Sequence, residues 1–268
     1  MNPNNIDFDS LQDDSKNRLN FSEPLATNAS LPAFAAANGL SFTASADIAQ
    51  ESSTVIHNPY YGLTRNRVLL DIIGGQVNSL RYRLFRYCFV AGGGKTTRRC
   101  TAQFAVIDLP SKVPHISLTS RRYSGNALVT TQRFNSGQEL NVEPEINAAF
   151  KVESPAATAQ IADQLLCPPV VQALEKFAAD YVIEFIDNKV YLYAPGFDGS
   201  KASYEQLYTS VMELSAVLAP VLPSLPALAA DAPRLATYDF WKNNAIGFVV
   251  IAAFFIVAMI VAGLIMAR

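Results

Sequence analysis

An uncharged run from Ala245 to Ala267 constrains this chain more than any other feature of its sequence. As a helix, at about 1.5 Å per residue, the run is roughly 34 Å long and exceeds a hydrocarbon core of about 30 Å. It is apolar on every side, whereas a surface helix of a soluble domain has one polar face. We therefore expect a transmembrane helix over residues 244–267, and a purely soluble protein is excluded.

The residues around this run predict its orientation. Three aromatic residues and Lys242 precede it, as is typical of the headgroup region of a bilayer. The first residues, Met1 to Asp7, have neither the basic nor the apolar part of a signal peptide. We expect a tail-anchored, single-pass protein of the cell membrane whose N-terminal domain is cytoplasmic. The rest of the chain has no second apolar stretch of 18 residues, which argues against a multi-span protein.

The remaining sequence changes from strands to helices along its length. We predict strands over residues 68–73, 80–90, 98–109 and 116–119, the first ending at Gly74-Gly75. We predict helices over residues 31–39, 155–166, 168–179 and 203–218, and a hairpin of two strands, 181–186 and 190–194, that turns at residues 187–189. This order predicts an α+β fold with an antiparallel strand-rich N-terminal half and a helix-rich C-terminal half containing a hairpin, plus one C-terminal transmembrane helix.

Composition divides the chain into four segments. Residues 1–30 are polar and acidic and predict a disordered arm. Residues 31–219 form the cytoplasmic α+β domain, and residues 220–243 form a Pro-rich linker and juxtamembrane segment, which precedes the membrane helix 244–267. Four prolines between positions 220 and 233 favour an extended linker.

A glycine-rich segment, Gly92 to Lys95, invites comparison with a phosphate-binding loop. That motif also requires a glycine where Phe89 stands and a helix after the lysine, whereas residues 98–109 have the composition of a strand. Apolar residues alternate on both sides of the glycines, which predicts a hairpin with Tyr87 opposite Cys100 and residues 92–95 as its loop. We therefore predict no cofactor.

The basic residues are concentrated in one part of the chain. Residues 65–133 contain twelve basic and two acidic residues, although the whole chain has a net charge of −2. One interpretation is internal: the basic strands face the acidic helices or lie on a solvated outer face. The other is an anionic partner, because each basic group near an anionic leaflet contributes about 1 kcal/mol. The candidate contact residues are Lys95, Arg98, Arg99, Arg121 and Arg122. Nucleic acid is not expected, since the interleaved aromatic residues already form a core face.

No pattern of residues indicates catalysis or metal binding. The three cysteines lack the spacing of a metal site or a disulfide framework, and we expect both histidines, His57 and His115, in loops. Asp71 is unusual because it stands among apolar residues of a strand, and we expect it on the solvent face. Glu143 and Glu145 flank a proline without further support. Motifs of serine hydrolases and zinc proteases are missing from the sequence. We assign no catalytic and no metal-binding residue.

Several short segments together resemble a family of uncharacterised bacterial membrane-associated proteins, grouped as a domain of unknown function. These segments are residues 31–42, 65–75, 82–89, 104–110, 146–154, 165–169 and 182–193. The resemblance extends over residues 31–219. It implies one contiguous α+β domain and supplies no catalytic residue.

Together these features predict a recognition or scaffolding module at the inner leaflet. Its expected partners are the lipid bilayer, with anionic lipid as a docking surface, and a protein in the membrane or cytoplasm. Two alternatives remain: a membrane-proximal enzyme acting on a lipid headgroup or other anionic substrate, and a structural subunit of a larger envelope complex.

Overall fold

The computed structural model describes residues 6–11, 28–57, 65–91, 97–121, 134, 138–142, 144–177, 181–195 and 200–236. The predicted membrane helix 244–267 and residues 92–96 of the glycine-rich loop lie outside these residues. The strands are β1 (Ser41–Ala46), β2 (Arg65–Val77), β3 (Leu80–Ala91), β4 (Arg98–Ser120), β5 (Phe150–Glu153) and β6 (Val182–Pro195). The α-helices are α1 (Leu31–Ala37), α2 (Thr54–His57), α3 (Pro144–Ala149), α4 (Ala159–Leu165), α5 (Pro168–Phe177) and α6 (Lys201–Val221). Four short 3-10 helices accompany them in the described chain: η1 (Phe8–Ser10), η2 (Ile48–Gln50), η5 (Ala156–Thr158) and η6 (Leu222–Ser224).

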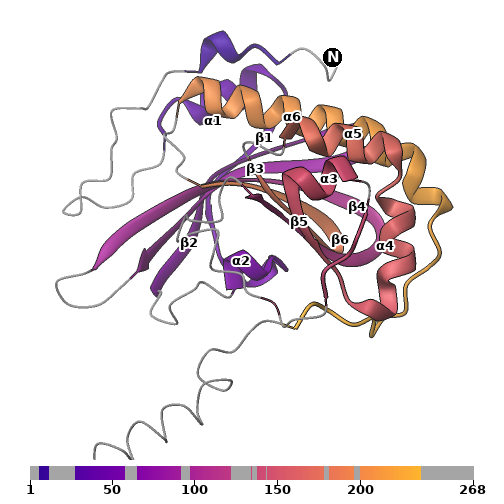
Figure 1. The fold of residues 1–268 in the computed structure, drawn as a ribbon. Coiled ribbons are helices and arrows are strands. Elements are labelled where there is room, and N and C mark those ends of the chain that lie inside the picture. The colour runs from indigo at the N-terminus through magenta and orange to yellow at the C-terminus, as the bar shows by residue number, and fades with distance from the viewer. Residues whose placement is uncertain are drawn as a thin grey trace, which may run out of the picture.

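The described strands form one antiparallel sheet, with helices on both of its faces. Its order is β1-β2-β3-β4-β5, and β6 also pairs with β4. Helices α1, α3, α4, α5 and α6 lie on one side of the sheet, and α2 lies on the other (Figure 1). Strands dominate the first half of the described chain and helices the second, so the α+β class predicted from the sequence is confirmed.

The long strand β4 replaces two predicted strands. We expected a break at Pro110 and Pro114, but one strand runs from Arg98 to Ser120. Its first half pairs with β3, its last four residues pair with β5, and β6 pairs with both halves. The two prolines lie where the register between β4 and β6 shifts, and a missing backbone N–H is tolerated at such an irregularity.

The predicted hairpin at residues 187–189 is wrong for a related reason. Strand β6 continues without reversal from Val182 to Pro195. Asp187 does adopt the left-handed conformation that the sequence suggested, with φ of 55°. It lies opposite Val113, in the irregular part of β4, so the left-handed residue accommodates a bulge while both halves of β6 stay paired with β4.

The two glycines in β2 do not end the strand either. Gly74 pairs with Ser41 of β1 and with Arg83 of β3, and β2 continues to Val77. A Cβ atom on Gly75 would lie 2.7 Å from the hydroxyl of Tyr82 and 2.9 Å from Leu40 Cδ2. The glycine is therefore required for the close approach of these two side chains.

The hairpin of β3 and β4 is confirmed, but its register differs from the prediction by two residues. Tyr87 lies opposite Ala102 and Phe89 opposite Cys100. A shift of two keeps every side chain on its expected face, so the apolar residues of both strands still form one cluster. Cys88 and Cys100 do not form the disulfide that the predicted register also excluded.

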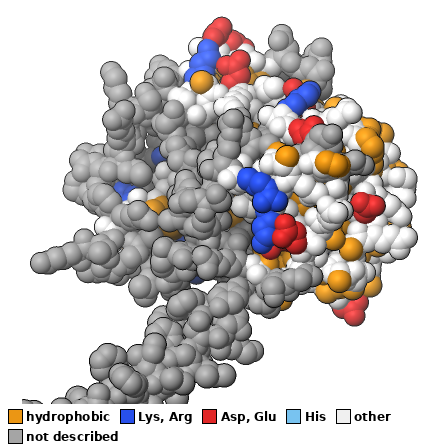
Figure 2. All heavy atoms as spheres, viewed as in Figure 1, with side chains coloured by type: hydrophobic (Ala, Val, Ile, Leu, Met, Phe, Trp, Pro, Cys, Tyr) orange, Lys and Arg blue, Asp and Glu red, His pale blue; other side chains and the backbone are white. Residues whose placement is uncertain are grey.

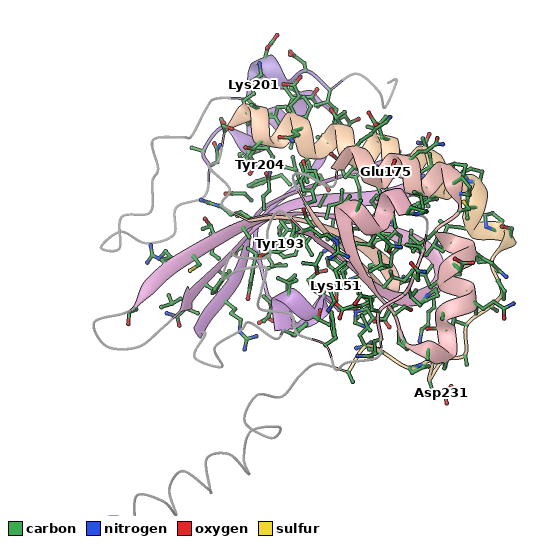
Figure 3. The ribbon with its side chains drawn as sticks, viewed as in Figure 1. Lys151, Glu175, Tyr193, Lys201, Tyr204 and Asp231 are labelled. Carbon is green, nitrogen blue, oxygen red and sulfur yellow. The ribbon has the colours of Figure 1, made fainter. Side chains whose placement is uncertain are left out.

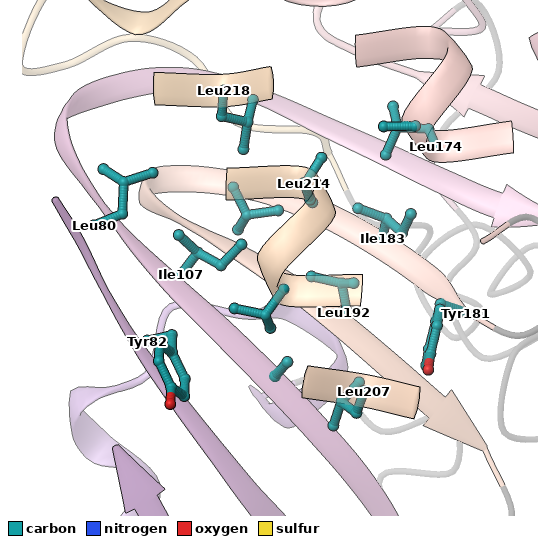
Figure 4. Packing of buried hydrophobic residues seen from close by; sticks show 14 of the residues in the cluster. Leu80, Tyr82, Ile107, Leu174, Tyr181, Ile183, Leu192, Leu207, Leu214 and Leu218 are labelled. Atoms are coloured by element: carbon teal, nitrogen blue, oxygen red, sulfur yellow. The ribbon is translucent and has the colours of Figure 1, made fainter. Parts of the chain in front are cut away.

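The main core lies between the sheet and helix α6. The predicted apolar face of α6 is buried in full, and it consists of Tyr204, Leu207, Tyr208, Val211, Leu214 and Leu218. It packs against residues such as Ile107 of β4 and Leu192 of β6 (Figure 4). Residues 201–224, which include α6, are also the described helical stretch long and apolar enough to cross a membrane. Here that apolar face covers the sheet.

Both ends of the described chain pack on this body. Residues 6–11, expected in a disordered arm, bury Phe8 and Leu11 against it. Residues 225–236, expected in an extended linker, run from the end of α6 past α4 (Figure 1). Leu235, near the end of this C-terminal strap, is only 4 % exposed.

Candidate functional site

The structure places the predicted basic residues unequally. Lys95 and Arg122 lie outside the described residues, and only the backbone of Arg98 is described. Arg98 and Arg99 begin β4 and lie opposite Ala91 and Val90 of β3. Because Arg65 of β2 also lies opposite Val90, the register gathers these three arginines at one end of the sheet. The strands extend to this end beyond the helices, at the left of Figure 1.

Arg121 lies elsewhere, at the far end of β4. Its Nε donates a 2.7 Å hydrogen bond to the carbonyl oxygen of Asn147, and its guanidinium is 3.9 Å from Glu139. The five candidate residues therefore do not form one described cluster. Arg98 and Arg99 share one end of the sheet, whereas Arg121 is joined to the region of α3.

Other arginines of the strands bind partners within the domain, and two of them bind buried acids. Arg83 is 2.6 Å from Glu51, and Arg86 is 2.5 Å from Asp71. Arg67 donates to the carbonyl oxygens of Ile56 and His57. These contacts support the internal interpretation for this part of the basic charge, with partners in loops and strands rather than in the acidic helices. On the face shown in Figure 2, basic side chains likewise lie next to acidic ones.

Asp71 is not on the solvent face, as we expected, but is buried with 1 % exposure. It occupies an irregularity between Leu70 and Ile73 and has φ of 57°, a conformation that aspartate tolerates better than most residues. One carboxylate oxygen accepts from Arg86 and the other accepts from the backbone N–H of Asn28 at 3.0 Å. Asp71 therefore connects the segment before α1 to β3.

A second buried acid, Glu51, holds the segment that covers the other face of the sheet. Besides Arg83, its carboxylate contacts Lys189 Nζ at 3.4 Å and accepts a 2.9 Å hydrogen bond from the hydroxyl of Tyr191. Burial alone would raise the pKa of Glu51, but the hydrogen bond and charge of Arg83, with help from Lys189, hold the pKa below its usual 4.5. Glu51 is therefore ionised at neutral pH.

A third buried acid, Glu184 of β6, pairs with His115 of β4. His115 Nε2 is 3.0 Å from Glu184 Oε1, and both side chains are 2 % exposed or less. Thr54 donates to the same carboxyl group through its backbone N–H at 3.1 Å and through its hydroxyl at 2.5 Å. The expectation that His115 is a loop residue is wrong, because it lies inside a strand and joins β4, β6 and α2. His57 also lies in a helix, α2.

The C-terminal strap is fixed to the same region. The backbone N–H of Leu235 donates a 3.0 Å hydrogen bond to His115 Nδ1, so the neutral ring carries its hydrogen on Nε2 and donates it to Glu184. Arg234 binds Asp187 at 2.7 Å, and Lys112 donates to the carbonyl oxygen of Ala230 at 3.0 Å. Burial opposes ionisation of Asp187, but hydrogen bonds from Ser52 and Arg234 lower its pKa below 3.8.

These three acids were not recognised as a set from the sequence. Asp71 alone attracted attention, because it interrupts an apolar strand, and Glu51 and Glu184 carry no such signal. Each of the three carboxyl groups binds donors from two or more elements, so the arrangement fastens segments to the sheet. The Glu184–His115 pair has the composition of an acid–base dyad, but both of its partners face other protein groups.

Three other features of the described residues were candidates for a functional site: metal-ligating side chains, a surface groove and the thiol of Cys88. Among the described residues no group of three metal-ligating side chains comes together. A groove of about 430 Å³ lies between α5 and α6 and is lined by polar residues such as Glu205, Gln206 and Thr209. Burial raises the pKa of the Cys88 thiol to about 11, which keeps it from acting as a thiolate.

Comparison with known proteins gives one distant likeness. No family model and no curated protein matches the chain. The crystal structure of the mycobacterial trehalose monomycolate transport factor A, TtfA, is similar over 74 % of this chain and 96 % of that chain, with a TM-score of 0.45 and 10 % sequence identity. A likeness of this degree says nothing about the function of this chain.

Proposed function

We propose that the chain is a tail-anchored membrane protein whose cytoplasmic domain is a recognition module that docks on anionic lipid through the end of its β3–β4 hairpin. The observation that carries this proposal is the register of β2, β3 and β4. It brings Arg65, Arg98 and Arg99 to the end of the sheet where β3 ends and β4 begins, and Lys95 lies between these two strands in the sequence. We also propose that the chain is related to the bacterial membrane-associated family that its sequence resembles. That resemblance implies one α+β domain and supplies no catalytic residue, which agrees with a recognition module.

The division of charge within the strands supports the same surface. Arg83 and Arg86 are bound to Glu51 and Asp71, so their charge is compensated inside the domain. The sequence around the hairpin end is basic, because positions 91–107 contain Lys95, Arg98 and Arg99 and no acidic residue. An anionic leaflet attracts such a cluster over about one Debye length, roughly 8 Å at physiological salt.

The test uses the full chain in nanodiscs, because the anchor makes simple vesicle binding uninformative. An environment-sensitive fluorophore is attached at Gly93→Cys in a Cys167→Ser background, since Cys88 and Cys100 are buried. We expect a blue shift of its emission with phosphatidylglycerol and none with phosphatidylcholine alone, and we expect added salt to reduce the shift.

Matched variants separate specific docking from net charge. The Lys95→Gln/Arg98→Gln chain should lose the shift, whereas Arg81→Gln/Lys176→Gln should retain it. The control removes the same charge from side chains that are 79 % and 65 % exposed and lie away from the hairpin end. An equal shift in both lipids, or equal loss in both variants, would contradict lipid docking at this surface.

A further inference from the structure

The N-terminal residues 6–11 occupy a groove between α1 and α6. Phe8 is 8 % exposed, and its ring centroid lies 5.4 Å from that of Phe34 in α1 and 5.6 Å from that of Tyr208 in α6. The ring centroid of Tyr208 in turn lies 5.7 Å from that of Tyr82 in β3. Leu11, 4 % exposed, packs into the same core cluster. Two apolar side chains, three residues apart, thus anchor the segment.

Polar contacts at the two helix ends orient the segment in this groove. Asp9 forms an ion pair with Lys201, the first residue of α6, and Lys201 lies at the end of α6 next to η1 (Figure 3). The backbone N–H of Asp7 donates a 2.7 Å hydrogen bond to Asn38 Oδ1 at the end of α1. The groove therefore combines aromatic walls with a cation at one side and an amide acceptor at the other.

The segment also has the form of a short self-contained ligand. Asp7 Oδ1 accepts from the backbone N–H of Asp9 at 2.9 Å, and the N–H of Leu11 donates to the carbonyl of Phe8 at 3.0 Å. These bonds make one turn that presents Phe8 and Leu11 on the same side. Short helical motifs recognised by grooves use apolar anchors at such i and i+3 positions.

Few contacts attach residues 6–11 to the rest of the domain. Two buried apolar anchors, the partly buried Ile6, the hydrogen bond to Asn38 and one surface ion pair stabilise the segment, and the ordering of its backbone opposes them. Residues 12–27 connect it to the body, so it competes for the groove at the high effective concentration of an intramolecular ligand. Such a segment can be displaced by a second ligand of similar chemistry.

We propose that the α1–α6 groove is a binding site for a protein partner that presents an acidic peptide with a phenylalanine and, three residues later, a leucine, and that residues 6–11 are its internal competitor. The groove selects an acidic partner because Lys201 stands at its edge. This site is separate from the basic hairpin end, so it gives the membrane-anchored domain a second, protein-directed surface.

The test measures binding of a fluorescent synthetic peptide with the sequence of residues 5–12 to the full chain in detergent micelles, by fluorescence anisotropy. The Phe8→Ala/Leu11→Ala chain, whose own segment lacks both anchors, should bind the peptide at least tenfold more tightly than the wild-type chain. A peptide in which the phenylalanine and leucine are replaced by alanine should not bind. Equal binding to both chains, or none to either, overturns the proposal.

Two further measurements identify the groove and its occupant. In the Phe8→Ala/Leu11→Ala background, Lys201→Glu should weaken peptide binding, whereas Lys176→Glu, an exposed lysine on α5, should not. Excess peptide should increase hydrogen exchange of residues 6–11 in the wild-type chain, a readout that holds even if the double variant folds poorly. Equal effects of the two lysine variants, or unchanged hydrogen exchange of residues 6–11, would overturn the assignment. So would a dimer in which residues 6–11 of one copy occupy the groove of the other.

Discussion

The backbone N–H of Leu235 donates a hydrogen bond to Nδ1 of His115, 3.0 Å away, and so joins the last described residues of the chain to a buried side chain in the middle of β4. The other nitrogen of the same ring is bound to Glu184, which also holds Thr54 at the start of α2. One imidazole therefore connects the C-terminal strap, through Glu184, with the start of α2. The strap lies just before the segment in which the sequence predicts a membrane helix.

Two substitutions of His115 separate its two bonds. Asparagine reproduces an acceptor near the position of Nδ1, whereas glutamine reproduces a donor near the position of Nε2. We expect His115→Gln to increase hydrogen exchange of the Leu235 amide, because it keeps the bond to Glu184 and loses the bond to the strap. His115→Asn should keep that amide protected but lower the free energy of unfolding by about 1–3 kcal/mol, since Glu184 loses a buried donor. Equal exchange at Leu235 in both variants would show that the strap is held by other contacts.

The ion pair of Glu51 predicts a pH dependence of stability. Its folded-state pKa is lowered below 4.5, so the pair stabilises the fold fully above about pH 4.5, and this stabilisation is lost as the pH falls through the lowered pKa. We expect Glu51→Gln to cost about 3 kcal/mol at neutral pH, because Arg83 and Lys189 lose a buried partner, and to cost progressively less in acid. Urea unfolding of both chains in detergent, followed by circular dichroism from pH 7 to pH 3, measures the difference. A difference that stays constant with pH would contradict this role of the carboxylate.

The elements predicted best are those whose pattern is local. Helix α6 repeats its apolar residues at helical spacing, and all six residues of the predicted stripe are buried. Helix α1 has Pro32 in its first turn and Gly39 beyond its end, where φ is 65°. In both cases one segment of sequence contains the residues that start, orient and end the element.

The elements predicted poorly depend on partners far along the chain. The local sequence predicts that a strand ends at Pro110, Pro114 and Asp187. Each of these residues instead lies within a strand that continues. The strands continue because β4 and β6 pair on both sides of the irregularity, between residues that are 65 to 93 positions apart. The two-residue error in the β3–β4 register has the same origin, since alternation fixes the face of a strand but not its shift by two.

The candidate site shows the same limit. The concentration of basic residues in the strands was visible in the sequence, but the acids that compensate Arg83 and Arg86 were not assigned to them. Glu51 lies 32 positions from Arg83, and Asp71 was expected to face solvent. Burial of Asp71 follows from the left-handed irregularity of β2, which a strand pattern does not indicate.

The contact of Gly75 with Tyr82 predicts a specific cost for a small side chain. In Gly75→Ala the new Cβ would lie 2.7 Å from the tyrosine hydroxyl and 2.9 Å from Leu40 Cδ2, so we expect a loss of about 1–3 kcal/mol in the free energy of unfolding. Tyr82→Phe in the same chain should recover part of that loss, because it removes the nearest atom. Denaturant unfolding of the single and double variants measures the recovery. If Tyr82→Phe restored nothing, the contacts of the new Cβ with Leu40 and with the ring carbon Cζ of residue 82, each at 2.9 Å, would set the cost.

The ion pair of Asp71 and Arg86 predicts which substitutions of the acid are tolerated. Asn keeps an acceptor for the backbone N–H of Asn28 and tolerates the φ of 57°, but it lacks the charge that Arg86 requires. We therefore expect Asp71→Asn to lower the free energy of unfolding by about 2 kcal/mol and Asp71→Ala by about 3–5 kcal/mol, since alanine also leaves the amide unpaired. Only Asp71→Ala should increase hydrogen exchange at Asn28, because the local bond depends on an acceptor rather than on charge. Equal exchange at Asn28 in the two variants would show that the segment before α1 is held independently of Asp71.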